Sequence, residues 1–251
     1  IEANILKREE PIVQELANEY LAEQGITILN DVTLNSVSND GDKPVITANG
    51  QNYTFDAVLY ATGRRPNTTH IGLENTEITT NERGAIVVND TCESSVPGVY
   101  AVGDVNGGPQ FTYISLDDFR IVFGALTGNG HYTLKDRKNI PYTTFLTPPL
   151  ARVGLTEEDA INKGYTVKTK EMLVATMPRA HVNDNLKGAF KIVVDAESNL
   201  ILGATLYSQS AEELINLIKI AMDNNIPYTY FKNQIFTHPT MAENLNDLCN
   251  F

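Results

Sequence analysis

The spacing of apolar residues predicts several amphipathic helices in this 251-residue chain. Between residues 9 and 24 the apolar side chains fall on one face of a helix, and Gly25 is placed to end it. The same helical spacing recurs in three later stretches, which are residues 115–126, a helix beginning at Thr156, and residues 211–222.

Other apolar runs have the length and alternation of β-strands. Residues 32–55 contain short alternating runs separated by Asn-Asp-Gly and Asn-Gly turns, which predict a β-meander. Residues 57–61 are apolar on both faces, as in a buried parallel strand. Further strands are predicted at residues 26–29, 85–88, 99–102, 142–146, 166–176, 189–195 and 201–207.

The order of these elements divides the chain into an α/β part and a later α+β part with a small antiparallel sheet. The polar residues 64–67 interrupt the first part and suggest a domain crossing, and a linker-like stretch ends near residue 139. We therefore predict three domains, at residues 1–62, 63–138 and 139–251.

Composition excludes some classes of function. The formal net charge of −12 opposes binding to nucleic acid, because phosphates require lysine and arginine. No apolar run reaches the roughly 18 residues of a membrane span, and no signal peptide is visible. Because the two cysteines, Cys92 and Cys249, lie far apart and the histidines lack metal-ligand spacing, we predict a reducing cytoplasm and no metal site.

Two strings of small residues follow predicted strands and leave room for a ligand. Residues 57–61 lead into Thr62-Gly63, and residues 99–102 lead into Gly103-Asp104. Ligands of open α/β sheets bind at the carboxyl ends of strands, where an aspartate is placed to accept hydrogen bonds from ligand hydroxyls. The alternatives are a tight turn at Gly63 and a surface turn with a solvated Asp104.

A third string, Thr-His-Pro-Thr-Met-Ala-Glu over residues 237–243, places a histidine just before a helix start. Thr240 and Glu243 have the spacing of a capping box, so Thr240 is predicted to begin the last helix. If a carboxylate orients His238 instead, the imidazole becomes a general acid or base near neutral pH. The two roles of Glu243 compete for the same oxygens.

The first two strings resemble a pair found in flavoproteins with two dinucleotide-binding domains. In those proteins an ATG-type strand end precedes a YAxGD string, and both strings occur here in that order. The resemblance implies that Asp104 binds a ribityl hydroxyl of FAD, that Gly103 beside it also belongs to the cofactor site, and that Gly63 lies near the crossing between an NAD(P) domain and an FAD domain. The stretch implied to pass near the flavin ring contains Gln110, Phe111 and Thr112.

The third string resembles the HPTxxE signature of class I pyridine nucleotide-disulfide oxidoreductases, such as glutathione reductase, dihydrolipoamide dehydrogenase and mercuric reductase. The resemblance implies that His238 and Glu243 form a catalytic dyad acting on redox thiols of the partner subunit in a homodimer. Residues 110–118 and 235–248 most resemble bacterial hypothiocyanous acid reductases. The implied domains are a partial Rossmann-type NAD(P)-binding domain (1–62), an FAD-binding segment (63–138) and an α+β dimerisation domain (139–251).

Three features of that family do not occur in this sequence. There is no GxGxxG phosphate loop and no CxxxxC redox pair, and the chain begins inside a Rossmann-type unit. Glu2 resembles the acid that binds the adenosine ribose hydroxyls, and the alternative is a frayed terminal residue. The simplest interpretation is a C-terminal fragment of a longer chain.

We therefore predict part of an FAD-dependent oxidoreductase that passes electrons from NAD(P)H through FAD to a dithiol outside this chain, and then to a small disulfide or oxidant. The fragment is expected to be inactive alone, and nucleic acid and membranes are not expected partners. One alternative is a non-catalytic dimerisation or binding module that keeps the family's tail. Another is a relative of NADH oxidase or peroxidase without a dithiol, against which His238 argues.

Overall fold

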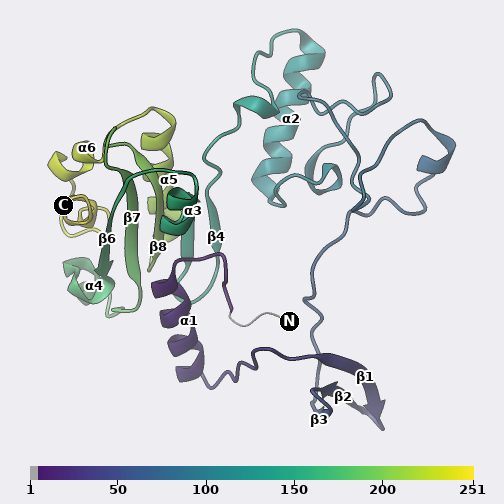
Figure 1. Ribbon diagram of the computed structural model, residues 1–251, viewed down its shortest axis with the longest axis horizontal. Helices are drawn as coiled ribbons and strands as arrows, with labels where there is room; N and C mark the ends of the chain where they lie inside the picture. Colours follow the sequence, from purple (N-terminus) through teal and green to yellow (C-terminus); the bar gives the residue numbers. More distant parts are fainter. Residues whose placement is uncertain (1–4) are drawn as a thin grey trace. The chain divides into compact units, whose positions relative to one another are not determined.

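The computed structural model describes residues 5–251, so Glu2 lies outside the described residues. Two compact units make up the chain. Ile1–Val58 and Asn139–Phe251 belong to the first unit, and Leu59–Lys138 form the second. In Figure 1 the chain can be followed from the first unit into the second and back into the first.

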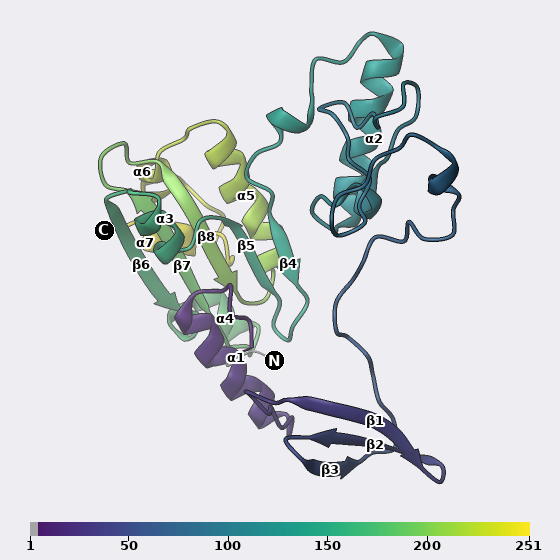
Figure 2. The ribbon, with the colours of Figure 1, turned by 45° about the vertical axis from the view of Figure 1, so that its right-hand side comes forward.

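The first unit is built on a five-stranded antiparallel sheet with the order β4-β5-β8-β7-β6. Its strands β7 and β8 form a hairpin, are almost entirely buried and lie inside the sheet (Figures 1 and 2). The predicted small antiparallel sheet is thereby confirmed. The strands are β4 (Tyr142–Thr144), β5 (Leu150–Gly154), β6 (Val167–Leu173), β7 (Ala189–Asp195) and β8 (Ile201–Tyr207).

Side chains alternate between the two faces of this sheet, and each face has its own cover. On one face, Phe190 and Ile192 belong to a core that includes Ile218 of α5 (Ala211–Asp223), the predicted helix. Helix α6 (Tyr228–Asn233) is not among the predicted elements, because six residues are too few to show a helical period. The same core includes three shorter helices, α4 (Pro178–Val182), α6 (Tyr228–Asn233) and α7 (Asn244–Leu248).

The opposite face of the sheet packs against α1 (Pro11–Glu23), which matches the helix predicted from residues 9–24. Val13 and Ala17 of α1 are fully buried and lie in one cluster with Tyr207 of β8. The apolar face that the sequence pattern predicts for this helix is therefore the face that the sheet covers.

The short helix α3 (Glu157–Asn162), the helix predicted to begin at Thr156, starts with a capping box. The Asp159 N–H donates to Thr156 Oγ1 at 3.1 Å, and the Thr156 N–H donates to Asp159 Oδ2 at 3.3 Å. The two bonds satisfy backbone donors that a helix start otherwise leaves free.

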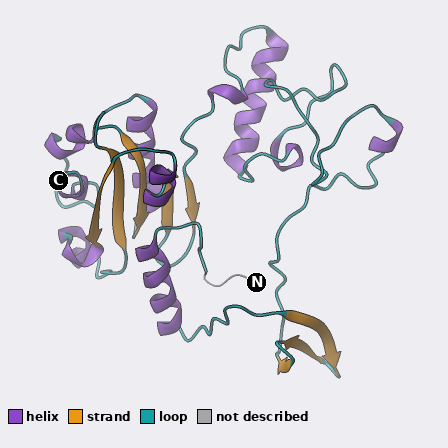
Figure 3. Cartoon of the chain, in the orientation of Figure 1, coloured by secondary structure: helices purple, strands orange, loops and turns teal. Residues whose placement is uncertain are grey.

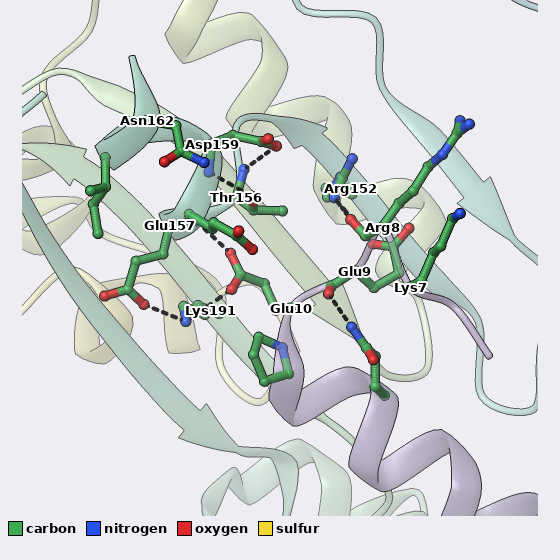
Figure 4. Close-up of a pocket in the computed structure, with 14 residues that line it drawn as sticks. Lys7, Arg8, Glu9, Glu10, Arg152, Thr156, Glu157, Asp159, Asn162 and Lys191 are labelled. Atoms are coloured by element: carbon green, nitrogen blue, oxygen red, sulfur yellow. Dashed lines mark hydrogen bonds and ion pairs between the residues drawn. The ribbon is translucent and has the colours of Figure 1, made fainter. Parts of the chain in front are cut away.

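Lys191 of β7 is a buried cation, with its side chain only 5% exposed. Its amine contacts the carboxylates of Glu10 at 3.0 Å, Glu157 at 2.7 Å and Glu171 at 2.9 Å. Figure 4 shows the amine between Glu10 and Glu157, on the wall of a pocket of about 640 Å³. Glu10 directly precedes α1 and is 3% exposed, so this ion pair joins α1 to the sheet.

Residues 32–55 form the predicted β-meander, a three-stranded antiparallel sheet with the order β1-β2-β3. Glycines at positive φ occupy the predicted turns, Gly41 between the first two strands and Gly50 between the last two. The strands are β1 (Leu34–Asp40), β2 (Lys43–Ala48) and β3 (Gln51–Thr54).

The second unit contains one long helix, α2 (Thr112–Thr127), which agrees with the helix predicted at residues 115–126. Figure 3 shows that loops make up most of the remaining chain in this unit. Short 3-10 turns interrupt these loops at Leu73–Asn75, Gly103–Asn106 and Leu134–Asp136. Within residues 5–251, each helix is too short or too polar to cross a membrane.

Four of the predicted strands are wrong. Leu59, expected in a buried parallel strand, is 90% exposed. A strand exists only where neighbouring backbone accepts its hydrogen bonds, and among the described residues these runs make at most isolated bridges, such as Thr80–Ile86 and Glu93–Tyr100. The runs concerned are residues 26–29, 57–61, 85–88 and 99–102.

We expect Lys191→Met to lower the free energy of unfolding of the first unit by about 3–5 kcal/mol, because it leaves the buried Glu10 carboxylate without its counter-charge. Urea unfolding followed by circular dichroism measures this change. The matched control is Lys43→Met, since Lys43 and Asp56 form an exposed pair whose loss should cost less than about 1 kcal/mol. Equal effects of the two substitutions would contradict the structural role of the buried pair.

The stability of the first unit is also expected to fall at alkaline pH. Desolvation lowers the pKa of Lys191, but hydrogen bonds to Glu157, Glu171 and Glu10 outweigh it and raise the pKa above its ordinary 10.5. The resulting stabilisation is complete below pH 10.5 and is lost as the pH rises through the folded-state pKa. Urea unfolding from about pH 8 to pH 12 should show this loss, and Lys191→Met should lack it.

Candidate histidine–glutamate site and cofactor loop

The segment that carries His238 turns sharply just before α7. The His238–Pro239 peptide bond is cis, and the Thr240 hydroxyl donates to the Thr237 carbonyl at 2.7 Å. Thr240 and Glu243 also bond reciprocally, since the Thr240 N–H donates to Glu243 Oε1 at 3.1 Å and the Glu243 N–H donates to Thr240 Oγ1 at 3.3 Å. These bonds hold the Glu243 carboxylate beside the histidine ring.

His238 and Glu243 are in direct contact. Nδ1 of His238 lies 2.7 Å from Glu243 Oε2, the oxygen that the Thr240 N–H does not use. Glu243 therefore caps the turn and orients the histidine at the same time, because each of its two oxygens makes one of these bonds. The His238 side chain is 68% exposed, and its Nε2 lies on the ring edge away from the carboxylate. Such a ring is oriented on one side and accessible on the other, as a general acid or base requires.

The last helix begins later than predicted. Its first residue is Asn244 rather than Thr240, and Glu243 stands at the N-cap position. The capping-box bonds do form, but they close the turn that precedes the helix. Side chains thus satisfy the first N–H groups before the helical hydrogen bonds start.

In the second unit, the Gly103-Asp104 loop is held by a buried carboxylate. Asp118 of α2 is 0% exposed and accepts hydrogen bonds from the Gly103 N–H at 2.7 Å and from Asn106 Nδ2 at 2.9 Å. Gly103 has φ 72°, and a Cβ there would lie 2.5 Å from the Ser115 hydroxyl. The positive φ and this close contact with α2 both favour glycine at this point.

The charge of Asp118 is balanced by Arg137, whose guanidinium bonds both Asp118 and its neighbour Asp117, the latter at 2.8 Å. Desolvation lowers the pKa of Arg137, yet its bonds to the two aspartates outweigh this and raise it. Sequence reasoning missed both Asp118 and Arg137. The signal was present, because Asp118 shares the apolar helix face with Ile114 and Ile121, where an isolated charge is unfavourable.

Asp104 itself points its carboxylate toward accessible space. Its side chain is 50% exposed, and Arg64 Nη1 lies 3.6 Å from Asp104 Oδ2. Gly63, with φ 117°, directly precedes Arg64, so the structure brings the two predicted glycine strings to one place. A half-exposed carboxylate on a glycine loop fits the hydroxyl-rich ribityl chain of a flavin, since a carboxylate has two oxygens that can accept hydrogen bonds.

The remaining predicted cofactor residues lie where α2 begins. Gln110 contributes to a pocket of about 530 Å³ whose wall also includes Arg64 and Gly107. Phe111 is the N-cap residue of α2, and its ring stacks on that of Tyr113 with centroids 5.1 Å apart. Thr112 is the first residue of the helix. Of the predicted cofactor residues, only Glu2 lies outside the described residues.

Both cysteines are buried within the protein core. Burial raises the pKa of the Cys92 thiol to about 11, and the nearby Asp118 carboxylate adds to this effect. Burial also raises the pKa of Cys249, which lies at the end of α7, to about 12. Neither sulfur is therefore a thiolate near neutral pH, and Cys249 fits an ordinary core cysteine.

Comparison with known families defines the class of protein to which these features belong. Residues 1–118 match the family "Pyridine nucleotide-disulphide oxidoreductase", and residues 140–249 match "Pyridine nucleotide-disulphide oxidoreductase, dimerisation domain". The chain belongs to this family, whose members are FAD-dependent enzymes that use NAD(P)H.

Among its relatives, the probable pyridine nucleotide-disulfide oxidoreductase RclA of Escherichia coli (strain K12) is 42% identical, covering 97% of this chain and 55% of that protein. A mercuric reductase of Staphylococcus aureus is 34% identical, covering 96% of this chain and 45% of that protein. The solved structure of the "HOCl-induced flavoprotein disulfide reductase RclA from Escherichia coli" aligns with a TM-score of 0.95 at 40% identity, over 99% of this chain and 57% of that one. The chain spans about half the length of these curated relatives.

We expect neither cysteine to react readily with a thiol reagent while the chain is folded. Cys92 and Cys249 are both inaccessible, and their raised pKa values keep the sulfurs protonated. Titration with Ellman's reagent at about pH 8 should detect almost no thiol before urea is added and both thiols afterwards. Rapid reaction of one thiol in the folded chain would show that its surroundings open. Single Cys92→Ser and Cys249→Ser variants identify which one.

Proposed function

We propose that this chain is the C-terminal part of an FAD-dependent NAD(P)H:disulfide oxidoreductase, in which His238 and Glu243 act as a catalytic dyad. The observation that carries the proposal is the 2.7 Å contact between His238 Nδ1 and Glu243 Oε2, in a chain that belongs to the pyridine nucleotide-disulphide oxidoreductase family. The redox dithiol is supplied by a segment outside this chain.

The dyad's role follows from which ring atom is oriented and which is accessible. Glu243 accepts a hydrogen bond from the Nδ1–H group and so orients the ring, while Nε2 of the exposed imidazole takes up or releases a proton at a thiol sulfur. A thiolate beside the protonated ring is stabilised by its charge. Since Glu243 is bound to the Thr240 backbone, the carboxylate keeps this position without needing the substrate.

The second unit contributes the cofactor contacts. When bound, FAD would carry electrons between NAD(P)H and the dithiol. Asp104 would accept a hydrogen bond from a ribityl hydroxyl, while Gly103 lets the loop approach closely. We assign Gly63 to the crossing between the cofactor domains, and Gln110, Phe111 and Thr112 to the stretch beside the flavin ring. We also propose the domain limits 1–62, 63–138 and 139–251.

We propose that the intact protein is a cytoplasmic homodimer, with residues 139–251 at the interface and His238 serving the thiols of the other subunit. The match of residues 140–249 to a dimerisation domain supports this arrangement. The similar solved protein is described as an HOCl-induced flavoprotein disulfide reductase, which favours a small disulfide or related oxidant as the substrate. NAD(P)H is the proposed electron donor.

In the intact enzyme, His238→Gln should lower the rate of disulfide reduction by about 10²- to 10⁴-fold, the usual contribution of a general acid or base. Reduction of the flavin by NAD(P)H, followed by stopped-flow absorbance, should remain unchanged because the dyad acts only on the thiols. Glu243→Gln should give a smaller loss, since the amide still contacts the ring.

The matched control is His181→Gln, because His181 is also an exposed histidine but its ring contacts a backbone carbonyl, that of Ala175, in place of a carboxylate. It should leave both half-reactions unchanged. If His238→Gln retains the disulfide-reduction rate of the unaltered enzyme, the proposed dyad is wrong.

A further inference from the structure

Carbonyl groups at the end of α6 converge on one side-chain amide, that of Asn246 in α7. Asn246 Nδ2 donates to the carbonyls of Phe231 at 2.6 Å and Gln234 at 2.9 Å, and lies 3.5 Å from that of Lys232. The last carbonyls of a helix have no partner within it, so these bonds satisfy groups that would otherwise need water. Asn246 thereby joins the end of α6 to α7.

This link spans the loop that carries the proposed dyad. Gln234 lies four residues before His238, and Asn246 lies three residues after Glu243. The bond from Asn246 to Gln234 therefore closes a loop that contains both members of the pair. Closing a loop restricts the conformations open to the residues inside it.

Packing contributes little to holding the part of the loop before the dyad. Ile235 is 92% exposed and His238 is 68% exposed, and only Phe236 reaches the core, where its ring stacks on Phe231. Residues after the dyad histidine are better packed, since Met241 lies in the core and Ala242 packs against it. The part of the loop before His238 therefore depends mainly on hydrogen bonds for a fixed conformation.

We propose that Asn246 is a positioning residue for the His238–Glu243 pair, which it serves by fixing the loop that carries both side chains. The importance of Asn246 for catalysis rests on the proposed function. Its effect on the position of the His238 ring does not depend on that function. Asn246 lies outside the catalytic group itself, because its side chain bonds backbone carbonyls of Phe231 and Gln234 and not the side chains of the pair.

The test measures the His238 ring directly by nuclear magnetic resonance of the folded chain labelled with ¹⁵N-histidine. The Nδ1 proton bonded to Glu243 gives a downfield signal, and the His238→Gln variant assigns it. In Asn246→Ala the open fraction of this bond should rise by about five- to thirtyfold, seen as faster exchange of the Nδ1 proton with water. An unchanged exchange rate in the folded variant overturns the proposal.

Two controls separate positioning from general weakening of the helices. Lys170→Met removes two bonds from the other end of α7, where Lys170 Nζ bonds the carbonyls of Asp247 at 2.7 Å and Asn250 at 2.6 Å. Asn233→Ala removes a bond to the Thr229 carbonyl at 3.1 Å, which lies within α6. Both should leave the His238 signal unchanged, and an equal change in either overturns a specific role for Asn246.

If Asn246→Ala does not fold, Asn246→Gln provides the same measurement, because it keeps the amide donor but displaces it by one methylene. It should show a smaller increase in exchange, and no increase overturns the proposal.

Failure of the proposed catalytic dyad can be distinguished from failure of the positioning role of Asn246. An unaltered reduction rate in His238→Gln removes the catalytic dyad but not the loop geometry, while an unaltered His238 signal in Asn246→Ala removes only the positioning role.

Discussion

Each compact unit of this chain buries a charge whose partner lies elsewhere in the sequence, and the local structure is arranged around that pairing. In the first unit Lys191 of the sheet meets Glu10 at the start of α1, although 180 residues separate them along the chain. In the second, Asp118 meets Arg137. A buried charge without a partner is strongly unfavourable. The two ion pairs therefore restrict the positions of α1 against the sheet and of the loop that carries Arg137 against α2.

In each of the two candidate sites, one carboxylate uses its two oxygens for two different partners. Asp118 divides its oxygens between Arg137 and the Gly103-Asp104 loop, so the ion pair also sets the position of the proposed flavin-binding acid. Glu243 divides its oxygens between the Thr240 backbone and the His238 ring. In both cases one oxygen ties the carboxylate to the scaffold and the other acts on the site, which leaves the functional side chain accessible but oriented.

The periodicity of apolar residues correctly predicted the helices and strands whose buried face can be recognised from their own sequence. The helices α1, α2 and α5 and the hairpin of β7 and β8 appear as expected, because an amphipathic or continuously apolar segment shows its buried face in its own sequence. The apolar run at residues 57–61 fails for a different reason. A parallel strand is defined by its neighbours, and among the described residues no strand pairs with this run.

The sequence alone determined the class of the protein, because the HPTMAE and YAVGD strings have the residue types and spacing of that class. It also identified His238, Glu243 and Asp104 as candidate site residues. Only the tertiary structure decided how Glu243 serves a backbone N–H and a ring at once, and that Asn246 closes the loop around them. Spacing along a chain reports which side chains are near in sequence. The direction of a carboxylate oxygen, and the carbonyls that one amide reaches, depend on how distant segments pack.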